Sequence, residues 1–192
     1  MKSIVAFLIL LISLSISAQK LPYYELAEAP KEFTAGSVAS RMIDGLGFRY
    51  YWATEGLTDN DLQYRPTKEA RTTLETIDHI LILSVMTLST LEGKEVDFSE
   101  NEALSFEDIR KITLENFKKS SEILKKTKDL STFVMKIKRK SGVIEEYPFW
   151  NQLNGPIADA IWHVGQVVTF RRSSGNPFPK GVGLLTGKVS KQ

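Results

Sequence analysis

The apolar residues of this chain recur mostly at spacings of three and four, the period of an amphipathic α-helix. The first such stripe predicts a helix from about residue 33 or 35 to residue 55. We expect the following residues to form its inner face: Val38, Met42, Leu46, Tyr50 and Ala53. Gly45 and Gly47 weaken this helix, but they would also let a neighbouring segment approach it closely. Residues 57–65 then form a short connector.

Two further helices are predicted from their starting signals. Thr72 and Glu75 match a capping box, in which each side chain bonds the backbone N–H of the other residue, so a helix begins there and ends at Glu92–Gly93. Its main stripe consists of Leu74, Ile77, Leu81, Ser84 and Leu88. After a polar loop, Ser105 opens a third helix in a similar way, and that helix runs to about Lys126.

The last long helix is predicted over Asn154–Arg172. One of its stripes is apolar and consists of Ile157, Ile161, Val164 and Val168. A neighbouring stripe with the same spacing consists of Asp159, His163, Gln166 and Phe170. Arg171 and Arg172 occupy the last turn, where the helix dipole favours positive charge. A glycine and a proline just beyond this turn stop the helix.

Between the third and last helices, residues 131–139 alternate between apolar and polar, which is typical of a half-buried strand. Ser141–Gly142 is a turn signal, and residues 143–147 return as a second strand. The predicted fold class is therefore all-α: a four-helix bundle over residues 34–175, with a small β-hairpin between helices three and four. Residues 19–33 are an extended lead-in, and residues 176–192 are an aperiodic tail that wraps the surface.

Residues 1–18 are predicted to be a signal peptide. Lys2 precedes an almost wholly apolar run, and Ser17–Ala18 is a small-residue cleavage site, so the mature chain begins near Gln19. We therefore expect an exported protein, periplasmic or extracellular, with no membrane association after cleavage. An uncleaved N-terminal anchor is the alternative. The chain has no cysteine, which excludes disulfides, thiolate ligands and a cysteine nucleophile.

The formal net charge of +2 is small, and the lysines of the third helix are spread along a face that we expect to be solvated. A nucleic-acid partner is therefore not expected. The expected partner is a small-molecule substrate of unknown identity, and the sequence leaves a homodimer open.

Candidate chemistry rests on the two histidines of the chain, His79 and His163. Each lies in the middle of an apolar helix, and Asp159 lies one turn before His163. Two imidazoles and one carboxylate from facing helices would hold a divalent ion such as Zn, Ni, Fe or Mn. The same pattern is also typical of a hydrogen-bonded core histidine, of an aspartate that favours the helix dipole, or of a buried ion pair. Glu75, four residues before His79, is an alternative ligand, although its capping role is favoured.

These features resemble the DinB/YfiT-like family. The resemblance lies in Thr72–His79 with its lone histidine, in Asp159–Gln166 with its His-Val-Gly-Gln end, and in Phe48–Pro66. It covers about residues 35–175, and it implies a four-helix bundle that binds a divalent metal. In the family the ligands are a histidine on helix two and a His-x-x-x-His pair on helix four. This chain has Asp159 where the family usually has histidine. An aspartate can still be a ligand, but the metal and the affinity need not be those of the family.

The family includes thiol-dependent transferases and isomerases, and many members without an assigned reaction. A metal-activated water would give hydrolysis, and a metal-bound substrate anion would give group transfer. The expectation is therefore a metal-dependent hydrolase or transferase. Gln166, one turn after His163, would hydrogen-bond the site from outside the ligand set or face the substrate. The alternative is a non-catalytic exported bundle that binds a ligand or a protein, with a metal-free polar network of the same His and Asp residues.

Overall fold

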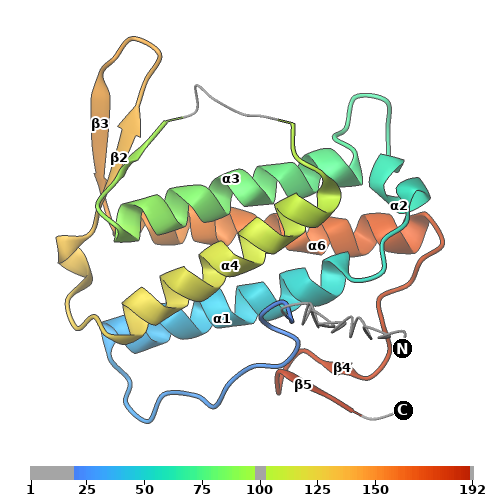
Figure 1. Ribbon diagram of the computed structural model, residues 1–192, viewed down its shortest axis with the longest axis horizontal. Coiled ribbons are helices and arrows are strands. Elements are labelled where there is room, and N and C mark those ends of the chain that lie inside the picture. Colours follow the sequence, from blue (N-terminus) through green and yellow to red (C-terminus); the bar gives the residue numbers. More distant parts are fainter. Residues whose placement is uncertain (1–19, 98–102, 191–192) are drawn as a thin grey trace, which may run out of the picture.

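The computed structural model describes residues 20–97 and 103–190, and the predicted signal peptide lies outside them. The described chain is mostly helical, with four long helices in the order expected from the sequence (Figure 1). These helices are α1 (Ala35–Thr54), α3 (Thr73–Leu91), α4 (Phe106–Lys125) and α6 (Ala158–Ser173). A short helix, α2 (Asp59–Gln63), lies in the segment that was expected to be a plain connector.

The four long helices pack around one core. Helix α4 packs against both α1 and α3, and α6 closes the ring by contacting α3 and α1. The largest fully buried apolar side chains come from α1, α3, α4 and, in the case of Ile157, from the turn before α6: Tyr50, Phe48, Phe117, Ile43, Leu46, Ile77, Ile80, Leu114, Leu124 and Ile157. Burial of each such side chain contributes about 1.5–3 kcal/mol, so this shared core holds the four helices together.

The helix starts follow the signals in the sequence. The predicted capping box of α3 is confirmed, because Thr72 N donates to Glu75 Oε2 at 2.6 Å and Glu75 N donates to Thr72 Oγ1 at 3.1 Å. Ser105 Oγ accepts from Asp108 N at 3.1 Å at the start of α4. Helix α1 has a box of its own, formed by Thr34 and Ser37, that the sequence analysis missed.

The predicted inner face of α1 was partly wrong. Val38 and Met42 are 47% and 41% exposed, whereas Ala39 and Ile43 are buried at 3% and 0%. Both adjacent stripes are apolar at this end of the helix, so spacing alone could not choose between them. The expected close approach is found at Gly47, where an added Cβ would lie 2.5 Å from the Tyr23 ring.

Two corrections apply to the last helix. It begins at Ala158 rather than Asn154, because a π-helical turn, η2 (Leu153–Ile157), precedes it after a short turn, α5 (Trp150–Gln152). Inside that turn Gly155 has φ −99° and ψ −106°, which breaks the regular helix. The predicted apolar stripe is buried at Val164 but exposed at Ile161 (38%), so α6 is less enclosed than its composition suggested.

The predicted hairpin is confirmed, but it belongs to a small sheet. Strand β2 (Val134–Lys138) follows a 3₁₀ turn, η1 (Leu130–Thr132), and pairs antiparallel with β3 (Ile144–Pro148). A third strand, β1 (Glu95–Val96), pairs parallel to β2 in a segment that was expected to be loop. The remainder of that loop, residues 98–102, lies outside the described residues. The fold is thus mostly helical with a small β-sheet, rather than all-α.

The two ends of the described chain are joined. The tail contains a second hairpin, β4 (Val182–Gly183) with β5 (Lys188–Val189), which the aperiodic sequence did not predict. Leu26 N donates to Gly187 O at 2.8 Å, and Val189 N donates to Glu25 Oε1 at 3.0 Å. The lead-in and the tail therefore stabilise one another on the surface of the helices.

Helix α3 is the most apolar of the long helices. Within the described residues it is the one helix long and apolar enough to cross a membrane by length and composition. Within that window, 56% is buried inside the protein, as in a helix that forms part of a core.

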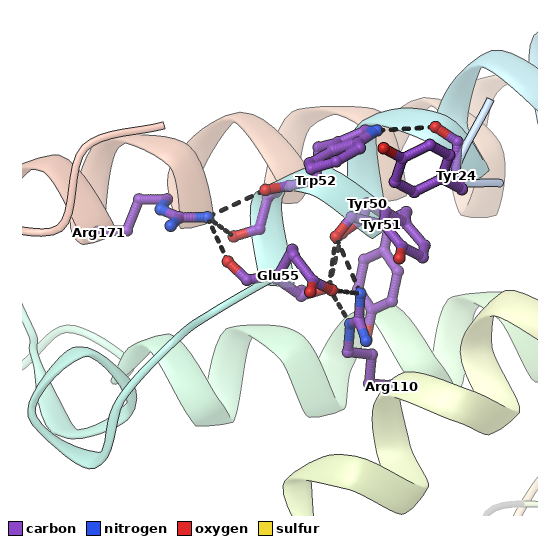
Figure 2. A network of polar contacts seen from close by, with 9 residues as sticks. Tyr24, Tyr50, Tyr51, Trp52, Glu55, Arg110 and Arg171 are labelled. Carbon is purple, nitrogen blue, oxygen red and sulfur yellow. Dashed lines mark hydrogen bonds and ion pairs between the residues drawn. The ribbon is translucent and has the colours of Figure 1, made fainter. Parts of the chain in front are cut away.

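Arg171 fixes the end of α6 against the end of α1 (Figure 2). Its side chain is 2% exposed, and Nη1 donates to the carbonyls of Trp52 and Ala53 at 3.0 Å and of Glu55 at 3.1 Å. These are carbonyls at the C-terminus of α1, which lack partners within their own helix. Arg171 was expected to favour the dipole of its own helix, but it caps the neighbouring one.

Candidate metal centre

The structure brings together the three residues that the sequence analysis proposed as ligands. His79 comes from α3, and Asp159 and His163 come from the first two turns of α6. Asp159 Oδ2 lies 3.2 Å from His79 Nε2, and Asp159 Oδ1 lies 3.3 Å from His163 Nε2. One donor atom from each residue lies within 4.8 Å of the others. The carboxylate thus bridges the two imidazoles.

Local structure explains this placement. The irregular turn η2 and its Pro156 come directly before α6, so Asp159 lies in the first turn of a helix whose N-terminus has no side-chain cap. The positive end of the helix dipole favours a carboxylate there. His163 follows one turn later on the same face. Because α3 packs against α6, His79 meets both residues, and its ring centroid lies 4.7 Å from that of His163.

Gln166 orients the His163 ring. His163 Nδ1 and Gln166 Oε1 are 2.8 Å apart, and an amide oxygen can only accept a hydrogen bond. A proton on Nδ1 would satisfy this contact and leave Nε2, which lies 3.3 Å from Asp159 Oδ1, as the nitrogen that could bind a metal ion.

The pKa of His79 is lowered, which favours the neutral imidazole that a metal ion requires. Burial lowers the pKa of His79, and the charges of Arg71 and His163 act in the same direction. The hydrogen bond and the charge of Asp159 oppose them without cancelling them. His79 is therefore neutral at neutral pH, and a neutral imidazole can act as a ligand.

The donor set fits a divalent ion. Bonds of about 2.0–2.2 Å from one ion to two donors span at most about 4.4 Å, so donors within 4.8 Å need only a small inward movement. Two imidazoles and one carboxylate suit Zn, Ni, Fe(II) or Mn. The side chains of His79, Asp159 and His163 are 25%, 36% and 13% exposed, which leaves a side open to solvent.

Glu75, the alternative ligand, lies outside this cluster of donor atoms. Its carboxylate accepts from Thr72 N at 2.6 Å and lies 3.8 Å from Arg65 Nη2. The same capping bond is the largest cause that lowers its pKa. Its role in the structure is therefore to start α3.

A cleft of about 770 Å³ opens beside His79, and sequence reasoning missed it. It is lined by the segment before α3, by one face of α3, and by residues around the start of α4. Its charged lining residues are Arg65, Glu69, Arg71, Glu75 and Asp78, and its apolar ones include Leu74, Ile82 and Leu104. The lining residues from α3 lie at helical spacing from His79 and share one face of that helix. This face becomes a cleft only because it lies opposite the residues around the start of α4.

Comparison with known proteins identifies no family for this chain. No protein-family model matches the sequence, and no curated protein matches it either.

Proposed function

We propose that this protein is an exported four-helix-bundle protein of the DinB/YfiT-like type that binds a divalent metal through His79, Asp159 and His163. The observation that carries the proposal is the convergence of these donors from two helices. The 3.3 Å separation of His163 Nε2 and Asp159 Oδ1 supports it, because both atoms can be directed at one ion. The order of the four long helices and the His-Val-Gly-Gln segment support the family resemblance.

The proposed activity is metal-dependent hydrolysis or group transfer on a small molecule. A divalent ion with three protein ligands keeps positions for water or substrate, and Zn²⁺ lowers the pKa of a coordinated water to about 7. The chain's own residues would hold and orient the site. Gln166 orients the His163 ring through its contact with Nδ1, and the packing of α3 on α6 sets the separation of the imidazoles. The cleft lined by His79 is the proposed place for a substrate.

A second function is favoured by one observation. His79 Nε2–H can donate to Asp159 Oδ2 at 3.2 Å, so part of the cluster is satisfied as a polar network without metal. In that case the protein is a non-catalytic binding protein.

Elemental analysis of the purified mature chain separates the two functions. We expect near-stoichiometric metal in the metal-binding case, lost when His163 is replaced by Gln. No metal after reconstitution with Zn²⁺, Mn²⁺ and Fe²⁺ would leave the polar network as the function of the cluster. Mass analysis of the same preparation tests export, because the mature chain should begin near Gln19. An intact N-terminus on a cytosolic protein would contradict export.

A further inference from the structure

The cleft beside His79 is where a ligand can approach the metal centre. It encloses about 770 Å³, within the range of small-molecule sites. His79 lines it, whereas Asp159 and His163 are not among its lining residues. A molecule in this cleft therefore meets the centre from the His79 side.

Among the residues that the structure describes, one cation in the cleft has no partner. Arg65 lies 3.8 Å from the Glu75 carboxylate and donates to Lys68 O at 3.3 Å. Arg71 is exposed and makes no hydrogen bond or ion pair within the described ranges, 20–97 and 103–190. Its positive charge nevertheless acts on the His79 imidazole. A guanidinium in this setting can bind a carboxylate through two parallel hydrogen bonds.

The carboxylates of the cleft limit which anions Arg71 can bind. Glu69 and Asp78 also line the cleft. With Arg65 and Glu75 paired, one cation and two carboxylates remain, and their net charge of −1 opposes a doubly charged anion such as a phosphate monoester more than a singly charged one. The acidic group is therefore a single carboxylate, held directly by the Arg71 guanidinium.

Spacing and polarity set the shape of the ligand. Arg71 lies just before Thr72, the N-cap of α3, and His79 lies seven residues beyond that cap, about 10 Å along the helix axis at a rise of about 1.5 Å per residue. Leu74 and Ile82 lie on the same side of the helix, and Leu104 lines the cleft from the segment before α4. An apolar stretch therefore separates the cation from the metal-directed end.

We propose that the cleft binds an elongated monocarboxylate, with its acid group on Arg71, its apolar middle on Leu74 and Ile82, and its other end at the metal centre. This inference rests on the proposed metal binding, and it adds the substrate class. Arg71 selects the substrate and does not hold the ion.

The test uses three eight-carbon hydroxamates on the Zn²⁺-loaded mature chain, with affinities from isothermal titration calorimetry. Each binds Zn²⁺ through its hydroxamate, and the far end is a carboxylate (suberic monohydroxamate), a methyl (octanohydroxamate) or an ammonium (8-aminooctanohydroxamate). Because the Arg71 guanidinium would form a charge-assisted hydrogen bond, the carboxylate should bind about tenfold or more tighter than the methyl compound. Arg71→Gln should remove this advantage and leave octanohydroxamate binding unchanged. Lys68→Gln is the matched control, because Lys68 is exposed, close in sequence and outside the cleft lining.

The outcomes separate the two proposals. Equal affinities for the carboxylate and methyl compounds, or an advantage that survives Arg71→Gln, would overturn the role of Arg71. Tightest binding of the ammonium compound would overturn it in favour of Glu69 and Asp78. If the chain retains Zn²⁺ but none of the three compounds binds, the cleft does not lead to the ion and the substrate class fails alone. If the chain retains no Zn²⁺, the metal centre itself fails, and the substrate class fails with it.

Discussion

Replacement of Asp159 is the most direct test of the metal centre, because its two oxygens lie 3.2 Å and 3.3 Å from the two imidazoles. Asp159→Ala removes one of three ligands and the only negative charge of the cluster. Loss of a hydrogen-bond partner of a metal ligand typically lowers metal affinity about 10–100-fold. Loss of a ligand should therefore lower it by at least about 100-fold.

Asp159→His should behave differently. It restores the His-x-x-x-His pattern usual in the family that this chain resembles, and it keeps a donor in the same helical turn. The net charge of the ion with its ligands would rise from +1 to +2, because the carboxylate is replaced by a neutral imidazole. We expect this variant to bind metal, with its preference shifted from Mn toward Zn or Ni.

Both variants would be assayed by competition with a chelator at fixed pH, with Zn²⁺ and Mn²⁺ in turn. Circular dichroism would check the fold, which should be retained because Asp159 is 36% exposed. Asp59→Ala is the matched control, since Asp59 is an exposed carboxylate in the first turn of another helix. If Asp159→Ala bound metal as tightly as the unmodified protein, Asp159 would not be a ligand, and the three-residue site would have to be abandoned.

Three further predictions concern stability. Arg171→Met should lower the free energy of unfolding, measured in urea, by about 2–4 kcal/mol, because buried carbonyls lose their donor. The control Arg172→Met replaces an exposed arginine and should change this free energy by no more than about 0.5 kcal/mol. Equal effects of the two substitutions would refute the capping role of Arg171. Burial raises the pKa of Asp61, but hydrogen bonds from Asn176, Ser174 and Thr58 outweigh it and hold the pKa at about 2, below the usual value. Asp61 therefore stabilises the fold above pH 4, and this contribution of about 2 kcal/mol is lost as pH falls toward 2. Asp61→Asn should flatten the pH dependence of unfolding over that interval, and an unchanged slope would contradict the assignment. Gly36→Ala should lower the melting temperature, since its Cβ would lie 2.0 Å from Thr127 O, whereas Gly165→Ala meets nothing within 4 Å and should raise stability by up to about 1 kcal/mol.

The sequence predicted the long helices well, because their caps and apolar spacing are local signals. Thr72 and Glu75 marked the start of α3, and the alternation of residues 131–139 marked the hairpin. Features that depend on distant partners were missed. Strand β1 has two residues, and its pairing with β2 cannot be seen from its own composition.

The candidate site was likewise predicted where its residues share local spacing and missed where it depends on packing. Asp159 and His163 could be joined by spacing on one helix, and His79 could be added because it is the other histidine of the chain. The cleft could not be predicted, because Leu104 reaches it only through the packing of the chain before α4. The exposure of Val38 and Ile161 was also beyond a periodicity argument, since the helix faces that meet are chosen by all four helices together.

The join between lead-in and tail has a consequence for substitutions far away in the sequence. Leu26 N donates to Gly187 O at 2.8 Å, and a Cβ added at Gly187 would lie 2.5 Å from the Leu26 side chain. Gly187 also has φ +68°, a backbone conformation that other residues rarely adopt. A larger residue at position 187 should therefore displace Leu26, although Trp52 Nε1 would still hold the lead-in on α1 through Tyr24 O. A change in the tail would in this way disturb the segment that precedes the first helix.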